Sequence, residues 1–299
     1  MSTSTEALPE PIAPPADGTS ARRRMRRGIL SSALLWVALA WITVMIGAAL
    51  LADLLPLASY EQRIGTPRTP PGLTWPEFLG TDQLGRSVLS RVIFGARVSL
   101  AVGLVAVTAA ALVGGLLGVL AGYLRGWPDK VIGLLLDSML AFPPLVLLLA
   151  ITAIQSQSFL TLTLALSLLS VPGFARLVRA NTLSLSKREF VDAARLLGSS
   201  PRRVLLREVL PNVVLPVLSY GVLVLAGLIV AEGSLSFLGL GIPAPRPSWG
   251  GMIASGRPML SSSPWLTFVP AIALFLTVLS INVIGDHARR LTDKKAAAL

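Results

Sequence analysis

The sequence contains no cysteine among its 299 residues and only one histidine, His287. The lack of cysteine excludes disulfides and thiolate metal sites, and a single histidine leaves no nucleophile–histidine pair for covalent catalysis. A phosphate-binding loop needs Gly-Lys followed by Ser or Thr, and none of the four lysines follows a glycine. We therefore expect no metal, no catalytic residue and no cofactor in this chain. We interpret His287 as a polar residue beside an apolar segment.

Charged residues are also scarce. They make up 14% of the chain, against about 25% in an average soluble domain. Hydrophobic residues make up 53% and the mean hydropathy is +0.72, which predicts an integral membrane protein. A net charge of +11 would suggest nucleic-acid binding in a soluble protein. In a membrane protein, we interpret the excess as positive charge beside the cytoplasmic ends of the spans.

Six apolar segments reach roughly 20 residues, the length of a membrane-spanning helix. They lie at approximately 29–52, 98–121, 131–154, 158–175, 213–235 and 265–285. The fourth is the shortest, and we expect Pro172-Gly173 to kink or end it. The pattern predicts an all-α polytopic membrane protein with six transmembrane helices.

These segments divide the chain into four parts. Residues 1–28 are rich first in Pro, Ser and Thr and then in Arg, and we expect a disordered basic cytoplasmic tail. The other parts are the first transmembrane helix with an extracytoplasmic segment at 29–96, a five-helix transmembrane domain at 97–287 with a cytoplasmic loop at 176–212, and a cytoplasmic tail at 288–299. The first apolar run is longer than the core of a secretory signal, so we interpret it as an uncleaved span.

The basic residues indicate the orientation of these spans. With the amino end inside, 19 of the 26 lysines and arginines lie in the cytoplasm and 7 lie outside. Cytoplasmic loops of membrane proteins carry this excess. The chain is therefore predicted to have both termini and the 176–212 loop in the cytoplasm.

That loop contains a charged stretch, EFVDAARLLGSSPRRVLLREVLPN at 189–212, with the signals of a helical hairpin. The expected signals are a capping box of Ser186 and Glu189, a helix to Leu197, a left-handed stop at Gly198, and a second helix with Ser200 as its cap and Pro201 in its first turn. Pro211 lies at the entry to the fifth span. Three interpretations are open: a DNA-binding helix-turn-helix, a docking helix for a cytoplasmic partner, and a solvated linker. Tethering between two spans disfavours insertion into a major groove.

The hairpin resembles the EAA loop of ABC-importer permeases, whose pattern is E-A-A-x3-G-x9-I-x-L-P. Asp192-Ala193-Ala194 is followed at this spacing by Gly198 and by Leu210-Pro211. Asp192 replaces the usual Glu, and Glu208 stands where the pattern has Ile. The resemblance implies that the loop docks on a separate ATPase. The residues it assigns to this coupling are Glu189, Asp192, Ala193, Ala194, Gly198, Leu210 and Pro211.

Two more stretches resemble permeases of the dipeptide, oligopeptide and nickel group. They are GTDQLGRSVLSRVIFGARVSL at 80–100, where Ser87 replaces the usual Asp, and LSFLGLGIPAPRPSWGGMI, which begins at about 235. The second is typical of the C-type subunit, and the resemblance covers about residues 29–287. It implies a type I ABC-importer permease fold and alternating access in a bacterial inner membrane.

The resemblance also implies partners. They are a second, non-identical permease, ATPase subunits that hold ATP and Mg, an extracytoplasmic substrate-binding protein and membrane lipid, with no nucleic acid. Peptides are the expected substrate, and nickel complexes, glutathione and haem are alternatives. An alternative of another class is a membrane scaffold that recruits a cytoplasmic protein without transport.

The second predicted span contains regularly spaced glycines, and the stretch before it contains an apolar stripe. Gly114, Gly118 and Gly122 lie four apart, on one helix face, where glycines allow close helix packing. They predict either a sliding interface or static packing. Leu84, Val88 and Val92 form an apolar stripe, which we interpret as an amphipathic helix on the outer membrane surface. The alternative is that this stretch simply lengthens the second span.

Two acidic residues lie within predicted spans. Asp137 lies in the third, where a carboxylate is costly unless it faces protein or water. We expect it to pair with a basic residue of a neighbouring helix, with a substrate role as the alternative. Glu232 lies near the outer end of the fifth span. It is a candidate for the substrate pathway or a gate, or a partner for Arg246 or Arg257.

Overall fold

The computed structural model describes residues 18–72, 75 and 77–297, which are mostly helical. The α-helices are α1 (Gly18–Leu50), α2 (Val88–Leu124), α3 (Gly126–Ala141), α4 (Pro144–Ile154), α5 (Phe159–Leu185), α6 (Glu189–Leu196), α7 (Pro201–Val204), α8 (Leu210–Phe237), α9 (Trp249–Gly256) and α10 (Trp265–Ala297). A π-helical turn, η1 (Leu205–Val209), joins α7 to α8, and a 3-10 turn, η2 (Arg257–Met259), follows α9. In the described residues, β pairing is limited to two isolated bridges in the segment before and at the start of α2.

The all-α fold is confirmed, with one refinement of the six segments. Five helices are long and apolar enough to cross a membrane: α1, α2, α5, α7 to α8 taken together, and α10. The third apolar segment forms two shorter helices, α3 and α4, separated at Phe142 and Pro143. Two successive prolines cause this break, because proline donates no backbone hydrogen bond and forces the preceding residue into an extended conformation.

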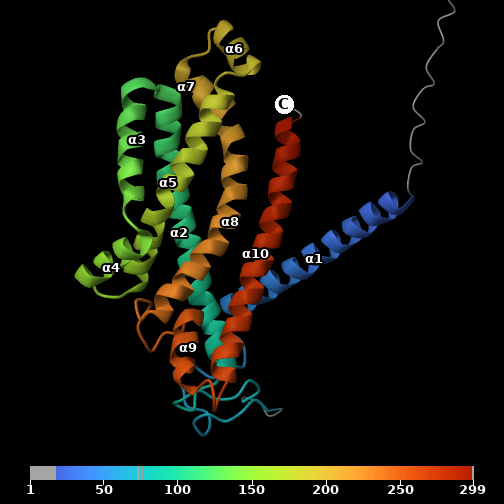
Figure 1. Cartoon of the computed structure of the whole chain (residues 1–299), viewed down its shortest axis with the longest axis vertical. Helices are drawn as coiled ribbons and strands as arrows, with labels where there is room; N and C mark the ends of the chain where they lie inside the picture. Colours follow the sequence, from blue (N-terminus) through green and yellow to red (C-terminus); the bar gives the residue numbers. More distant parts are fainter. Residues whose placement is uncertain (1–17, 73–74, 76, 298–299) are drawn as a thin grey trace, which may run out of the picture.

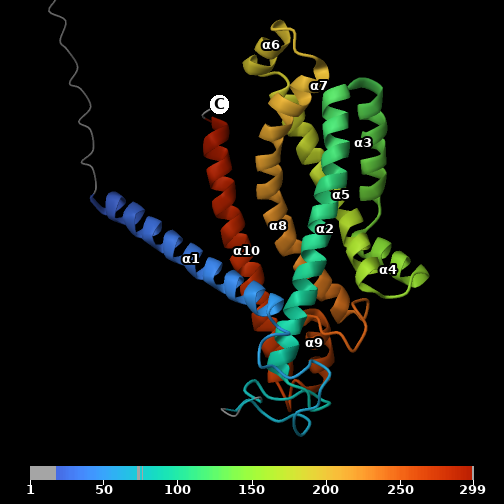
Figure 2. The same cartoon turned by 180° about the vertical axis from the view of Figure 1, so that it is seen from behind.

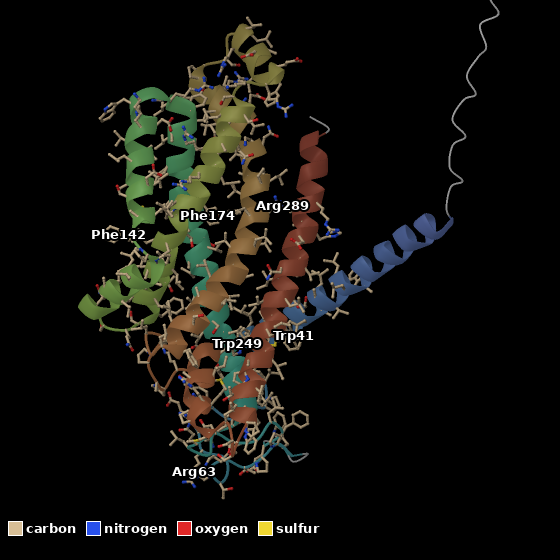
Figure 3. All side chains as sticks on the ribbon, viewed as in Figure 1. Trp41, Arg63, Phe142, Phe174, Trp249 and Arg289 are labelled. Carbon is tan, nitrogen blue, oxygen red and sulfur yellow. The ribbon has the colours of Figure 1, made fainter. Side chains whose placement is uncertain are left out.

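The helices form an elongated bundle (Figure 1). α2, α5 and α8 run side by side through its centre, with α3 and α4 on one side and α10 on the other. Figure 2 shows that α1 crosses the lower part of α10 and then diverges from the bundle. The indole Nε1 of Trp41 on α1 donates a 3.0 Å hydrogen bond to Thr277 Oγ1 on α10 near this crossing (Figure 3). The α6–α7 hairpin lies at one end of the bundle, and α9 lies near the other with the segment that precedes α2.

Three boundaries differ from the sequence-based expectation. Pro172 does not end the fourth span, because α5 continues through it to Leu185; membrane helices tolerate proline where neighbouring groups compensate for the lost hydrogen bond. α1 begins at Gly18, so part of the expected disordered tail is helical, while residues 1–17 lie outside the described part. α10 likewise continues into the expected carboxyl tail.

The separate amphipathic helix on the outer surface is a wrong prediction. α2 begins at Val88 and runs unbroken to Leu124, so the stretch lengthens the second span. Val88 and Val92 are buried in the protein core, whereas Leu84 precedes the helix and is exposed. Arg91 is also buried, and its Nε lies 3.4 Å from the Asp82 carboxylate. A surface helix would expose an arginine that lies off its apolar stripe. Here Arg91 is buried, so this stretch does not have the exposed polar face that the prediction requires.

The three spaced glycines form the closest contact between α2 and α5. A Cβ atom on Gly114 would lie 2.6 Å from the Val171 carbonyl oxygen, and one on Gly118 would lie 2.5 Å from that of Ala175. These distances are too short for any side chain, so the two backbones touch directly. The glycine face therefore packs within this chain.

Candidate functional site

The turn of the α6–α7 hairpin has the geometry that the sequence predicts. Gly198 has φ +82°, the left-handed conformation that glycine adopts at low cost. Its N–H donates to Arg195 O at 2.9 Å, and the Ser199 N–H donates to Ala194 O at 3.1 Å. These two bonds form a Schellman motif, which ends α6. A Cβ atom on Gly198 would have no atom within 4 Å, so the space beside the turn is open.

Of the two helix caps predicted for the hairpin, one is confirmed and the other is wrong. Ser200 caps α7 as predicted, with its Oγ accepting a 3.4 Å hydrogen bond from the Arg203 N–H, and Pro201 is the first helical residue. The predicted capping box of Ser186 and Glu189 is wrong. α5 continues to Leu185, so Ser186 caps the end of that helix, and α6 begins at Glu189 without a side-chain cap.

A cluster of buried valines anchors the hairpin to the spans. Its members come from five successive elements: Val178 of α5, Val191 of α6, Val204 of α7, Val209 of η1 and Val213 of α8. The Tyr123 hydroxyl at the end of α2 adds a 2.6 Å hydrogen bond to Pro201 O. The cluster therefore packs the hairpin against α5 and α8.

The opposite face of α6 is exposed. Leu196 and Leu197 are 88% and 87% exposed at the tip of the hairpin, beside exposed Asp192 and Ala193. Burying one leucine gains about 1.5–3 kcal/mol, so two exposed neighbours favour contact with another surface. Asp192 pairs with Arg195 at 3.1 Å. This face has the composition of a docking surface, with an apolar centre and a charged edge.

The predicted coupling residues lie in two places. Glu189, Asp192, Ala193, Ala194 and Gly198 lie on α6 and its turn, and Ala194 is partly buried toward the valine cluster. Leu210 and Pro211 begin α8, after the π-helical turn, and do not lie on the docking face. π-Helical turns within helices often mark functional positions. The second pair is therefore placed at the junction between the hairpin and the fifth span.

The predicted partner of Asp137 is present. Its Oδ1 lies 2.6 Å from Nη2 of Arg176 on α5, which confirms pairing with a basic residue of a neighbouring helix. Both side chains are more than half exposed, at 67% and 56%. On the same two helices, Arg179 makes two hydrogen bonds to Asp129, at 2.5 and 2.8 Å.

Glu232 has different partners from those predicted. It is fully buried, and its carboxylate accepts hydrogen bonds from Ser99 at 2.8 Å and Ser236 at 2.7 Å. Arg246 is exposed, and the Arg257 guanidinium lies over the Phe237 ring at 5.3 Å. Pairing with either arginine is therefore a wrong prediction. Its burial also leaves Glu232 with no exposed surface toward a substrate.

The buried carboxylate belongs to a network that the sequence did not reveal. The Ser99 hydroxyl also accepts a 3.3 Å hydrogen bond from the Trp249 N–H, and the Trp249 indole Nε1 donates to Val92 O at 3.0 Å. These bonds join α2, α8 and the start of α9, in the part of the bundle where Figure 3 labels Trp249. In the described part of the chain, no group of three or more His, Cys, Asp and Glu side chains is arranged to hold a metal ion.

Comparison with known proteins identifies the family. Residues 114–297 match the family described as binding-protein-dependent transport system inner membrane component. The dipeptide transport system permease protein DppC of Alkalihalophilus pseudofirmus is 37% identical over 96% of this chain and 95% of its own length. The glutathione transport system permease protein GsiD of Pectobacterium atrosepticum is 36% identical over 92% of this chain and 89% of its own.

Solved structures agree with this assignment at the level of fold. The inward-facing MetNI methionine ABC transporter contains a chain with a TM-score of 0.57 and 17% identity, covering 68% of this chain and 96% of that one. A chain of an amino acid ABC transporter gives a TM-score of 0.54, also at 17% identity, covering 68% and 94%. The protein belongs to the binding-protein-dependent ABC-importer permeases, in the dipeptide and oligopeptide group, and has the type I importer permease fold.

Proposed function

We propose that this permease subunit forms one half of the pore of an ATP-driven importer and carries peptides across the bacterial inner membrane by alternating access. Two relatives carry names that specify dipeptide and glutathione transport, and both substrates are peptides. The other half is a second, non-identical permease, and an extracytoplasmic binding protein delivers the substrate. ATP and Mg²⁺ bind to separate ATPase subunits. Both termini and the hairpin face the cytoplasm, as the distribution of basic residues favours.

The main support for this proposal is that α6 packs against the spans on one side and is exposed on the other. One side is fixed to α5 and α8 by the valine cluster, and the other exposes Leu196 and Leu197. A helix that is rigidly attached to the spans and apolar at its tip transmits the motion of a docked ATPase. Gly198 keeps the tip free of side-chain bulk, and Leu210 and Pro211 pass the movement into α8. Glu189, Asp192 and Arg195 supply the charged rim of the contact.

The substrate pathway in this proposal runs beside Asp137 and Arg176. Charged groups within membrane helices are stable when they face water or protein, and both of these side chains are more than half exposed. Peptides carry an ammonium and a carboxylate group, which match the charges of Asp137 and Arg176 respectively. Glu232, which is buried within the subunit, is assigned to the outer-end network and not to the pathway.

Uptake by reconstituted proteoliposomes tests the proposal. The tagged chain is purified in mild detergent with its co-purifying subunits, which are identified by mass spectrometry and placed in liposomes with the binding protein. The proposal predicts ATP-dependent uptake of a labelled dipeptide. A second arm uses glutathione, because one relative is named for it. Retention of a cytoplasmic partner with no uptake in any arm would instead support a membrane scaffold.

A further inference from the structure

A polar hollow lies beside the hairpin and shares Asp192 and Arg195 with the charged rim of the proposed docking contact. Its volume is about 360 Å³, and it is lined by Tyr123 and Arg125 at the end of α2, by Ser186 and Lys187 after α5, and by Asp192 and Arg195 of α6. Most of its lining surface is polar, unlike the apolar grooves along the spans. Three of its six lining residues are cationic and one is anionic, so the hollow favours a negatively charged ligand.

Two of these cations have no acidic partner. Arg195 is paired with Asp192 at 3.1 Å. Across the described residues, neither Arg125 nor Lys187 forms a side-chain ion pair or hydrogen bond, although both line the same hollow. Unpaired charges on two different elements that face one small space repel each other weakly, and a shared anion removes that repulsion.

A third group in the hollow also lacks a partner. Ser186 is 4% exposed, and within the described part of the chain its buried Oγ makes no hydrogen bond. Leaving a buried hydroxyl unsatisfied costs free energy, and such groups in folded proteins usually have a ligand, a water or a functional reason. Ser186 lines the same hollow as the two unpaired cations, and a hydroxyl with two cations is a donor set that suits an oxyanion.

Exposed apolar residues flank the hollow at the turn between α2 and α3. Leu124 and Trp127, on either side of Arg125, are 58% and 76% exposed. Exposed tryptophan and leucine beside a basic residue are typical of the membrane–water interface, and the cytoplasmic leaflet presents anionic phosphate groups there. The surrounding sequence therefore favours phosphate chemistry over a carboxylate ligand.

We propose that Arg125, Lys187 and Ser186 form a binding site for a phosphate-class anion, either the phosphodiester of an anionic lipid or free phosphate. The bound oxyanion bridges the α2–α3 turn to the start of the hairpin. The Tyr123–Pro201 hydrogen bond already holds the end of α2 near the second helix of the hairpin. Occupancy braces the hairpin against the bundle. This site goes beyond the proposed function, since anion binding is measurable without ATPase subunits or transport.

The test measures thermal unfolding and ligand binding on the full purified chain. One arm titrates sodium phosphate against sodium chloride at equal ionic strength, which separates binding from screening. The other compares nanodiscs of phosphatidylglycerol mixed with phosphatidylcholine against phosphatidylcholine alone, with retained lipid counted by native mass spectrometry. The variant Arg125→Gln/Lys187→Gln removes the paired cations. Its matched control, Arg202→Gln/Arg203→Gln, removes equal charge from exposed positions on α7 outside the hollow.

We expect the wild type and the control to prefer phosphate or phosphatidylglycerol, and the Arg125→Gln/Lys187→Gln variant to bind about tenfold or more weakly, since charge-assisted hydrogen bonds are the strong ones. Preference in the first arm identifies free phosphate, and preference only in the second identifies the lipid. Ser186→Ala should also weaken binding, while unfolding without anion stays unchanged or shifts to slightly higher temperature, because the variant loses no hydrogen bond and removes an unsatisfied buried hydroxyl.

Three results overturn the proposal. One is a wild-type chain with no preference in either arm. Another is equal loss of binding in the pocket variant and in its α7 control, which indicates diffuse attraction. The third is a pocket variant that binds anions normally but loses a co-purifying ATPase, since the cations then contact an acidic protein surface.

Discussion

The Ser99 hydroxyl on α2 donates a 2.8 Å hydrogen bond to the Glu232 carboxylate on α8, although 133 positions separate the two residues in sequence. A second donor, Ser236, lies one turn from Glu232 on the same helix. Ser99 also accepts a hydrogen bond from the start of α9. One buried carboxylate thus links α2 to α8 directly and to the start of α9 through Ser99.

Replacing Glu232 tests this network. Glu232→Leu removes both acceptor oxygens and leaves buried serine hydroxyls unpaired, which should destabilise the subunit by about 1–3 kcal/mol. Glu232→Gln keeps an acceptor and the shape of the side chain, so its loss should be clearly smaller. Thermal unfolding in detergent measures both variants. Equal stability of the leucine variant and the wild type would mean that the network does not hold these helices together.

The glycine face of α2 gives a second prediction. Gly118→Ala places a Cβ atom 2.5 Å from the Ala175 backbone oxygen, and separating α2 from α5 should cost roughly 1–3 kcal/mol. Gly115 is the matched control on the same helix, because a Cβ there meets no atom within 4 Å. Gly115→Ala should retain stability or gain up to about 1 kcal/mol from helix propensity. Similar unfolding of both variants would contradict the close packing of these helices.

Asp137 tests the substrate pathway. Its ion pair with Arg176 is largely exposed, so breaking it should change stability by less than about 1 kcal/mol. Asp137→Asn should nevertheless reduce dipeptide uptake several-fold if it faces the substrate. Asp53→Asn is a matched control, because Asp53 is 68% exposed and pairs with Arg97 at 2.9 Å, near the ends of α1 and α2. Equal uptake by both variants would remove Asp137 from the pathway.

Topology is tested by single cysteines in a chain that has none. Ser199 lies in the hairpin turn and Ser262 precedes α10, at opposite ends of the bundle. On intact cells, an impermeant thiol reagent should label Ser262→Cys and not Ser199→Cys. Labelling of Ser199→Cys only after the membrane is opened completes the assignment. Access to both positions from the same side would refute the six-segment topology.

Local signals in the sequence were sufficient for the spans and for the hairpin turn. Gly198, Ser200 and Pro201 each have a backbone preference that acts within a few residues, so their roles follow from neighbouring sequence. The spans are equally predictable from the sequence, because a helix that crosses a lipid bilayer needs a long apolar stretch. The two prolines that follow Phe142 indicate the break between α3 and α4. A count of apolar residues alone does not detect it.

Tertiary packing decided what the sequence did not predict. Ser186 and Glu189 fit a capping box, but α5 continues far enough to use Ser186 as its own end. Glu232 looked like a partner for arginine, while its actual donors are serines, one of them from a distant helix. Arg91 lies off the apolar stripe from which the amphipathic helix was predicted, yet it is buried beside Asp82. Each of these three environments depends on which helices pack together, and a local sequence pattern does not predict that.

Coupling through the hairpin is the central claim, and Gly198→Leu tests it most directly. At φ +82° a leucine costs roughly 1–2 kcal/mol in the backbone, and nothing in this chain fills the space beside it. Gly239→Leu is the matched control, because Gly239 has φ +81° and equally open surroundings at the other end of α8. ATPase co-purification and dipeptide uptake are measured together for both variants. Gly198→Leu should insert normally but lose docking and uptake, whereas Gly239→Leu should keep ATPase docking. Wild-type docking and uptake in Gly198→Leu would contradict the account.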